Sequence, residues 1–373
     1  MLGFSGKRKR TINLALQGGG VHGAFTWGVL DRLFEDDSPL HIAWISATSA
    51  GAVNAAALAS GLAEGGREGA RRTLRTVWEA VQEAGVPDLM RFYPFLRTFG
   101  RSSSLPPAAS LWSPYDFNPL GFDPLRRILE AHIDFERIRA FPQLELLIAA
   151  TDVATGTKRL FRRRELTVEA VLASACLPTI HHAVEIEGRA YWDGGFSANP
   201  DLVTLAGESP TRDTLLVLLS PVEQPGIPRT AREIAGEVSR ITFNQPLRRD
   251  VDMIEAAQMT GQRWWRSGTG TDRLARHRFH LVEAGHHTAM LPAESKVQPD
   301  RTVISHLFLA GAAEAGKWLE RHGQQVGRRA TVDLPAHFRK RSSRVSQTSE
   351  AFAPAQDDVL PDDAERPATA PGG

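Results

Sequence analysis

The sequence predicts an α/β fold, because short apolar strands alternate with amphipathic helices along the chain. The first unit is an apolar strand from Ile12 to Leu16, followed by three glycines and a helix that begins near His22. A second unit follows directly, with a strand over 41–46 and a helix over 52–60. A chain of 373 residues with 42% hydrophobic content can bury the large core that such a fold needs.

Composition excludes several classes of protein. The formal net charge is +1, so the chain has no overall field that would attract nucleic acid, and we expect no nucleic-acid partner. A single cysteine, Cys176, rules out an intrachain disulfide and fits a cytoplasmic location. No apolar run reaches the length of a membrane span. The basic residues 7–10 followed by an apolar segment resemble a signal peptide, but that segment stops at Gln17 without a cleavage site, so we predict a strand.

The first glycine turn predicts an anion site. Three consecutive residues without Cβ atoms lie between the strand and the helix: Gly18, Gly19 and Gly20. The helix that follows carries Phe25, Val29 and Leu33 at helical spacing. Backbone N–H groups of the turn and of the first helical turn therefore converge on one point, where a phosphate or a reaction oxyanion would be bound.

The second turn has the pattern of a nucleophile elbow. Ser49 stands between a strand and a helix made of small residues, a geometry that holds a hydroxyl out at the helix N-terminus. Gly51 supplies the small neighbour on one side, whereas Ala47 replaces the usual glycine on the other. A Ser at this place is also a common helix cap, so this motif alone does not assign a nucleophile.

The pairing of the two turns favours an acyl-transfer site. If the two strands are parallel neighbours, the glycine turn and the Ser lie at the same sheet edge, as oxyanion hole and nucleophile. The alternative is dinucleotide binding, since Gly18, Gly20 and Gly23 fit G-x-G-x-x-G. That motif needs an acidic residue at the end of the next strand, but residues 46–48 are Ser-Ala-Thr.

A carboxylate that fits this Ser follows a later strand. Residues 189–192 form an apolar strand that ends in Asp193, Gly194 and Gly195. An Asp before glycines is usually a turn former. Here it is also the best placed base for a Ser nucleophile, because its strand would belong to the same sheet.

The rest of the chain continues the alternation. Further strands are predicted over 144–151, 159–161, 215–220 and 277–283, and helices over 71–84, 124–132, 168–175, 229–243, 251–265 and 303–322.

Three further segments do not follow this alternation of strands and helices. Residues 92–115, rich in aromatics and proline, form either a lid over the substrate or a packed surface excursion. The Arg263–Arg266 cluster fits either contact with a membrane surface or core packing. The composition of residues 323–373 predicts a disordered tail.

Taken together, the motifs resemble those of bacterial patatin-like phospholipases. The matching segments occur in the family's order and cover about the first 206 residues: 18–23, 48–51, 151–153 with Gly156, 173–175 with Pro178, and 193–195. The resemblance implies a three-layer α/β/α sandwich with a mostly parallel central sheet. It also implies a catalytic domain over 12–206, with residues 207–322 continuing the same core.

The resemblance further implies a Ser-Asp dyad, with Ser49 as nucleophile and Asp193 as general base. The oxyanion hole would come from Gly18, Gly19 and Gly20, and the supporting motif positions are His22, Gly23, Ala47, Gly51, Gly194 and Gly195. The expected reaction is hydrolysis of acyl esters of phospholipids or other lipids, without a metal or cofactor. The alanine at position 47 is the one departure within a catalytic motif, and it puts strain at the elbow in question.

Alternatives remain at this point. A Ser-Asp-His triad is one, since three histidines follow the Asp in the order of α/β-hydrolases: His280, His286 and His287. A non-catalytic lipid-binding or regulatory module on the same fold is another. A third is a hydrolase of a storage polyester or an acyl thioester.

Overall fold

The structure is a computed structural model, and it describes residues 10–35, 38–92, 113–224, 226–261, 270–289, 291 and 293–339. Most of the segment predicted as a lid and the whole Arg263–Arg266 cluster lie outside these residues. No helix in the described part of the chain is both long enough and apolar enough to cross a membrane.

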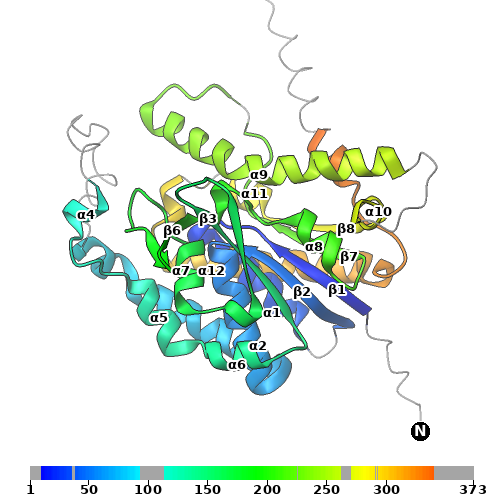
Figure 1. Cartoon of the computed structure of the whole chain (residues 1–373), viewed down its shortest axis with the longest axis horizontal. Coiled ribbons are helices and arrows are strands. Elements are labelled where there is room, and N and C mark those ends of the chain that lie inside the picture. Colours follow the sequence, from blue (N-terminus) through cyan, green and yellow to red (C-terminus); the bar gives the residue numbers. More distant parts are fainter. Residues whose placement is uncertain are drawn as a thin grey trace, which may run out of the picture.

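An eight-stranded sheet forms the centre of the molecule (Figure 1). Its strands are β1 (Arg10–Leu16), β2 (Leu40–Thr48), β3 (Glu145–Asp152), β4 (Lys158–Arg162), β5 (Val184–Ile186), β6 (Arg189–Asp193), β7 (Asp213–Leu218) and β8 (Arg278–Glu283). The strand order is β5-β6-β3-β2-β1-β7-β8, and β4 pairs with β3. Only β5 was not predicted, because three residues are too few to show a periodicity.

Five strands that are neighbours in this order run parallel to one another: β3, β2, β1, β7 and β8. The remaining strands are antiparallel, with β4 and β6 paired to β3 and β5 paired to β6. Since β1 and β2 are parallel neighbours, the turns that follow them lie at the same edge of the sheet.

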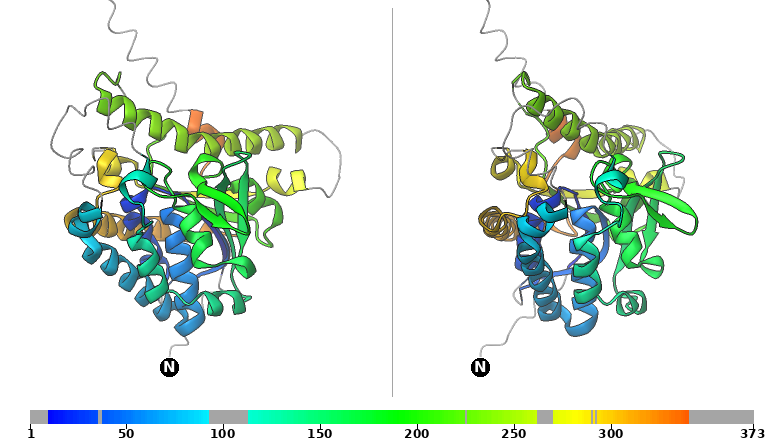
Figure 2. Two further views of the ribbon diagram at one scale, coloured as in Figure 1. Left: turned by 60° about the vertical axis from the view of Figure 1, so that its left-hand side comes forward. Right: turned by 90° about the vertical axis from the view of Figure 1, so that its left-hand side faces the viewer.

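Helices cover both faces of the sheet. They are α1 (Gly23–Leu33), α2 (Ala50–Phe92), α4 (Pro114–Phe117), α5 (Pro124–His132), α6 (Phe135–Ala140), α7 (Val168–Ser174), α8 (Leu202–Glu208), α9 (Ala231–Gly261), α10 (Gly270–Ala275), α11 (Gly285–Thr288) and α12 (Arg301–His322). Figure 2 shows α9 on the opposite side of the sheet from α2.

The side chains of β1 alternate between two hydrophobic clusters. Ile12, Leu14 and Leu16 join the larger cluster with residues of α1, α2 and α12, whereas Ala15 faces the cluster formed with α8 and α9. Alternation is what a strand buried on both faces requires. The predicted three-layer α/β/α architecture is thus confirmed.

Helix α2 reverses direction part of the way along its length. Gly66 has a φ of +60°, and a Cβ on Gly61 would lie 2.3 Å from the carbonyl oxygen of Gly69. The indole Nε1 of Trp78 donates a hydrogen bond of 2.9 Å to Asn54 Oδ1, 24 positions earlier, a contact that a straight helix could not make. The two arms correspond to the helices predicted over 52–60 and 71–84.

Two later predictions differ from the structure. Helix α9 continues through Pro246, where two separate helices were expected. The disordered tail was expected to begin at residue 323. The structure instead describes the chain up to residue 339, and Val326, Leu334 and Phe338 of this segment are buried against the core. The basic composition of that segment concealed these three apolar anchors.

Candidate active site

Ser49 occupies a sharp turn between β2 and α2. Its φ is +55°, which makes it one of two non-glycine residues with a positive φ in the described part of the chain. Such a conformation is strained for a side chain with a Cβ, and it is typical of functional sites. The turn is held from outside, because the Ser49 amide donates a hydrogen bond of 2.9 Å to Ser174 Oγ on α7.

The residues around the elbow explain its requirement for small side chains. A Cβ on Gly51 would lie 2.4 Å from the carbonyl oxygen of Leu16, so α2 can begin this close to β1 only with glycine there. Ala47 is different. It is fully buried within β2 and pairs in regular register with Leu16 and Ile148, so its methyl group causes no break in the ladder. The strain at the elbow is located at Ser49.

Asp193 ends β6 and lies beside this elbow. Sheet register brings them together, because Thr48 of β2 pairs with Ala149 of β3, and the adjacent Ala150 pairs with Asp193. Asp193 is 1% exposed, and its carboxyl accepts a hydrogen bond of 2.7 Å from the Gly195 amide. The Ser49 side chain is close enough to this carboxyl to lower its pKa.

Burial raises the pKa of Asp193 to about 7. The cause is loss of water around the carboxylate, which outweighs the effects of the Gly195 amide and the Ser49 side chain, both of which lower the pKa. A carboxylate with this pKa is a much better proton acceptor at neutral pH than an ordinary Asp.

The two positions that follow Asp193 have room only for glycine. A Cβ on Gly194 would lie 2.1 Å from the carbonyl oxygen of Ala149, and one on Gly195 would lie 2.2 Å from the Phe243 ring. Both glycines belong to the short 3-10 helix η4 (Gly194–Phe196), which crosses the end of β3.

The glycine turn after β1 lies directly against Ser49. A Cβ on Gly18 would lie 2.8 Å from the Ser49 Cβ, and Gly20 has a φ of +57° with no room for a side chain beside the Lys296 carbonyl. The Gly18 amide already donates a hydrogen bond of 2.8 Å to Asn199 Oδ1. Gly18 is therefore not free to donate to a substrate, unlike the prediction from sequence, whereas the amides of Gly19 and Gly20 have no acceptor among the described residues.

His22 and Gly23 support this turn. His22 Nε2 lies 2.7 Å from Ser295 Oγ, and burial together with the charge of Lys296 lowers the pKa of the imidazole to about 4. His22 is thus neutral at physiological pH. Gly23 lets α1 approach α2, since a Cβ there would lie 2.8 Å from the Ala50 Cβ.

Three positioning residues were not assigned from the sequence. Asn199 binds the Gly18 amide and donates from Nδ2 to the Phe243 carbonyl at 2.9 Å. Ser174 binds the Ser49 amide, and Thr151 Oγ1 donates to the Asp193 carbonyl at 2.8 Å. Ser174 and Thr151 stand in motifs that the sequence does display, whereas nothing local marks Asn199.

The three histidines considered for a triad have other surroundings. His280 is fully buried on β8, with Nε2 at 3.1 Å from Asp213 and Nδ1 at 2.9 Å from Thr331. His286 and His287 lie on α11, next to Glu314 of α12. In the described part of the chain, none of these three rings has a hydrogen bond with Asp193.

Two cavities are lined by residues next to the site. A cavity of about 550 Å³ adjoins the glycine turn through His22 and Leu219, and it is also lined by Arg240 and Lys296. A smaller one of about 210 Å³ adjoins Cys176, whose carbonyl accepts the Asp193 amide at 2.7 Å.

The comparison with protein families agrees with this order of motifs. The family model described as patatin-like phospholipase matches residues 14–206. Among solved structures, VipD from Legionella pneumophila is 14% identical with a TM-score of 0.42, over 91% of this chain and 75% of that one. ExoU in its complex with SpcU, from the type III secretion system of Pseudomonas aeruginosa, is 15% identical with a TM-score of 0.35, over 92% of this chain and 60% of that one. No curated protein matches the sequence.

Proposed function

The chain belongs to the patatin-like phospholipase family, and we propose that it is a serine acyl hydrolase in which Ser49 and Asp193 form a catalytic dyad. The observation that carries the proposal is the approach of the Ser49 side chain, on its strained turn, to the buried Asp193 carboxyl, whose pKa it lowers. The reaction is hydrolysis of a carboxylic ester of a phospholipid or a related acyl lipid.

In the first half of the reaction, Ser49 Oγ attacks the ester carbonyl carbon while its proton passes to the Asp193 carboxylate. The tetrahedral intermediate collapses, the alcohol leaves with that proton, and an acyl-enzyme remains. In the second half, Asp193 takes a proton from water, which attacks the acyl carbonyl and releases the fatty acid. The carboxylate is regenerated by returning its proton to Ser49.

The amides of Gly19 and Gly20 are the proposed oxyanion donors. Both belong to a turn that touches Ser49, and both lack an acceptor among the described residues. One such donor typically contributes about 3 kcal/mol to transition-state binding. Gly18 serves instead as the point where Asn199 fixes the turn.

Hydrolysis of a short-chain nitrophenyl ester tests the dyad. We expect Ser49→Ala and Asp193→Asn each to lower kcat/KM by about a thousandfold or more. Matched controls are Ser305→Ala and Asp252→Asn, at exposed positions of α12 and α9, which we expect to keep wild-type activity. A fluorophosphonate probe is expected to label wild type and not Ser49→Ala.

Two results would contradict the proposal. Equal activity in wild type and both dyad variants would refute the assignment of these residues. A wild-type protein that neither hydrolyses the ester nor reacts with the probe would indicate a non-catalytic lipid-binding module instead.

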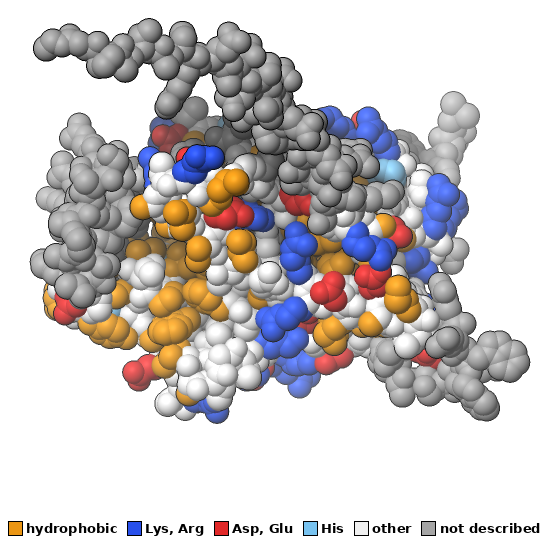
Figure 3. Space-filling view, turned by 90° about the horizontal axis from the view of Figure 1, so that it is seen from above, with side chains coloured by type: hydrophobic (Ala, Val, Ile, Leu, Met, Phe, Trp, Pro, Cys, Tyr) orange, Lys and Arg blue, Asp and Glu red, His pale blue; other side chains and the backbone are white. Residues whose placement is uncertain are grey.

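The larger cavity and the helix beside it support a lipid substrate. The first half of α9 exposes Ile234, Val238 and Ile241 by 47%, 58% and 44%, at a spacing that places them on one side of the helix. Figure 3 views this face of the molecule, where apolar side chains gather beside arginines and lysines. Exposed apolar side chains next to cations are typical of surfaces that contact lipid.

A cation inside that cavity suits a phosphate group. Lys296 lines the cavity and has no ion pair with a carboxylate among the described residues, whereas Arg240 is paired with Glu237. We therefore propose that the cavity receives the phosphate side of a phospholipid and that the first half of α9 touches the lipid surface.

Hydrolysis of anionic phospholipid vesicles tests the proposed roles of α9 in lipid contact and of the cavity in phosphate binding. Ile234→Ser combined with Val238→Ser should reduce vesicle hydrolysis severalfold and leave hydrolysis of a soluble nitrophenyl ester unchanged. Met259→Ser, at an exposed position on the other half of α9, is the control. Lys296→Met should lower activity on phospholipid more than on the neutral ester, and an equal loss on both would contradict the role in phosphate binding.

A further inference from the structure

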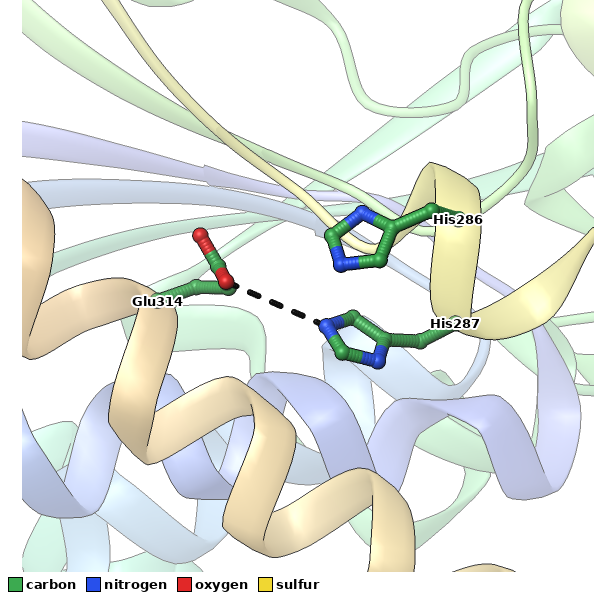
Figure 4. Close-up of side chains that lie close together, drawn as sticks. All are labelled: His286, His287 and Glu314. Carbon is green, nitrogen blue, oxygen red and sulfur yellow. Dashed lines mark ion pairs between the residues drawn. The ribbon is translucent and has the colours of Figure 1, made fainter.

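A group of metal-ligating side chains lies outside the proposed dyad, between α11 and α12. It consists of His286 and His287 on α11 and Glu314 on α12, which Figure 4 shows pointing toward one another. One nitrogen or oxygen atom from each residue lies within 4.8 Å of the other two. The two imidazole rings are side by side, with centroids 3.8 Å apart and planes tilted by 42°.

The contacts within this group are incomplete. His287 Nε2 is buried and has no hydrogen-bond partner among the described residues, and it lies 3.9 Å from Glu314 Oε1. This separation is too long for a hydrogen bond. A buried nitrogen without a partner has a free-energy cost, which a bound ion would remove.

We infer that His286, His287 and Glu314 form a binding site for a divalent transition-metal ion of the Zn²⁺ type. Two imidazoles and a carboxylate are ligands that Zn²⁺ favours, at about 2.0–2.2 Å from the metal. Ligand atoms of one tetrahedral zinc are about 3.4 Å apart, so small side-chain rotations would bring the three residues into place. The site is partly open, because His286 is exposed whereas His287 and Glu314 are mostly covered.

Two neighbouring residues modify the site. Lys317 Nζ forms an ion pair of 2.8 Å with the same Glu314 oxygen that faces His287, so it competes with a metal for that carboxylate. The ring of His306 lies 5.8 Å from that of His287, so its side chain would have to rotate toward the group to provide a fourth ligand. Otherwise water completes the coordination.

The ion would connect two elements that support the proposed active site. Helix α12 packs against α1, which follows the glycine turn. Helix α11 is fixed to the end of β7 by Thr288, whose Oγ1 donates to the Leu219 carbonyl at 2.8 Å, and the Leu219 side chain contacts Gly19. The role is therefore structural, and the reaction proposed above uses no metal.

Calorimetric titration of the untagged full chain with ZnCl₂, after treatment with EDTA, tests the site. Wild type is expected to bind one Zn²⁺ and to unfold at a higher temperature when loaded. His286→Ala and Glu314→Gln should each weaken binding by about tenfold or more. Lys317→Met, which removes the competing cation, should bind Zn²⁺ severalfold more tightly than wild type.

His41→Gln, at an exposed position of β2, is the matched control and should bind Zn²⁺ as wild type does. Circular dichroism establishes that the variants are folded. Absence of Zn²⁺ binding in wild type, or equal binding by wild type, His286→Ala and Glu314→Gln, would overturn the inference. Either result leaves the dyad unaffected, since ester hydrolysis is measured separately and is expected to persist in EDTA.

Discussion

The amide of Gly18 donates a hydrogen bond of 2.8 Å to the side-chain oxygen of Asn199. This bond ties the turn after the first strand to the segment that follows Asp193, although 181 positions separate the two residues. Through it, the proposed oxyanion donors and the proposed base are held in one fixed arrangement around Ser49.

Asn199→Ala should therefore impair catalysis more than stability. Without the side-chain oxygen the buried Gly18 amide loses its partner, at a cost of about 1–3 kcal/mol, and the turn can shift. We expect kcat/KM on a nitrophenyl ester to fall by about ten- to a hundredfold. Asn118→Ala is the control. The Asn118 side chain also bonds to backbone, accepting from the Phe122 amide and donating to the Phe122 carbonyl, but it is not part of the proposed dyad. A similar loss of activity in both variants would contradict a specific role for Asn199.

The activity should rise with pH through neutrality. The proposed base works only as a carboxylate, and burial raises the pKa of Asp193 to about 7. We expect kcat/KM to increase about tenfold per unit below this pKa and to level off above it. A profile measured from pH 5 to 9 checks this, and a plateau extending down to pH 5 would mean that Asp193 is not the titrating group.

The same burial should make the ionised Asp193 carboxylate lower the free energy of unfolding. Its pKa is raised from 3.8 to about 7, so the protonated form is favoured in the folded state. The stability this gives is present below pH 4 and is lost as the pH rises through 7. Asp193→Asn should thus be more stable than wild type at pH 8, by on the order of 4 kcal/mol as an upper limit. Urea unfolding at pH 5 and pH 8 measures it, and a gain that does not grow with pH would contradict this cause.

Asp213→Asn should have the opposite effect. This carboxylate is 1% exposed and is bound by His280, Arg278 and the Gly327 amide, which hold its pKa well below the ordinary value. Its stabilisation is present above about pH 4, the unfolded pKa, and is lost as the pH falls. Breaking such a buried pair costs about 3–5 kcal/mol. Urea unfolding at pH 7 should detect this loss, and a neutral effect would show that the pair contributes little.

Gly51→Ala should destabilise the protein and abolish activity. The new methyl group would lie 2.4 Å from the Leu16 carbonyl oxygen, which belongs to a buried strand and cannot move freely. The expected loss in the free energy of unfolding is several kcal/mol, which exceeds the about 1–3 kcal/mol that is typical of an overpacked core. Gly207→Ala is the matched control, since Gly207 lies in α8 with no atom within 4 Å of the added Cβ. It should stabilise by about 0.4–1 kcal/mol. Comparable unfolding free energies for the two variants would be inconsistent with the structure.

Much of the fold could be predicted because its signals are local. Each βα turn carries its own requirement: three residues without Cβ atoms after β1, and a Ser between small neighbours after β2. The helical hairpin at Gly66 also left a trace, as a glycine-rich gap between two periodic segments. The continuous α9 was less predictable, because tertiary packing overrides the tendency of Pro246 to end a helix.

The sequence by itself therefore determined the α/β class and the two turns, and it predicted Ser49 and Asp193 as the dyad, since these depend on backbone conformation and on residue type. Only the tertiary structure decided how those residues are held. Asn199 reaches Gly18, and Ser174 reaches the Ser49 amide, because sheet register and helix packing bring distant segments together. Burial of Asp193, and with it the raised pKa, is likewise a property of the assembled core. No local pattern encodes a distance between residues that are far apart in the chain.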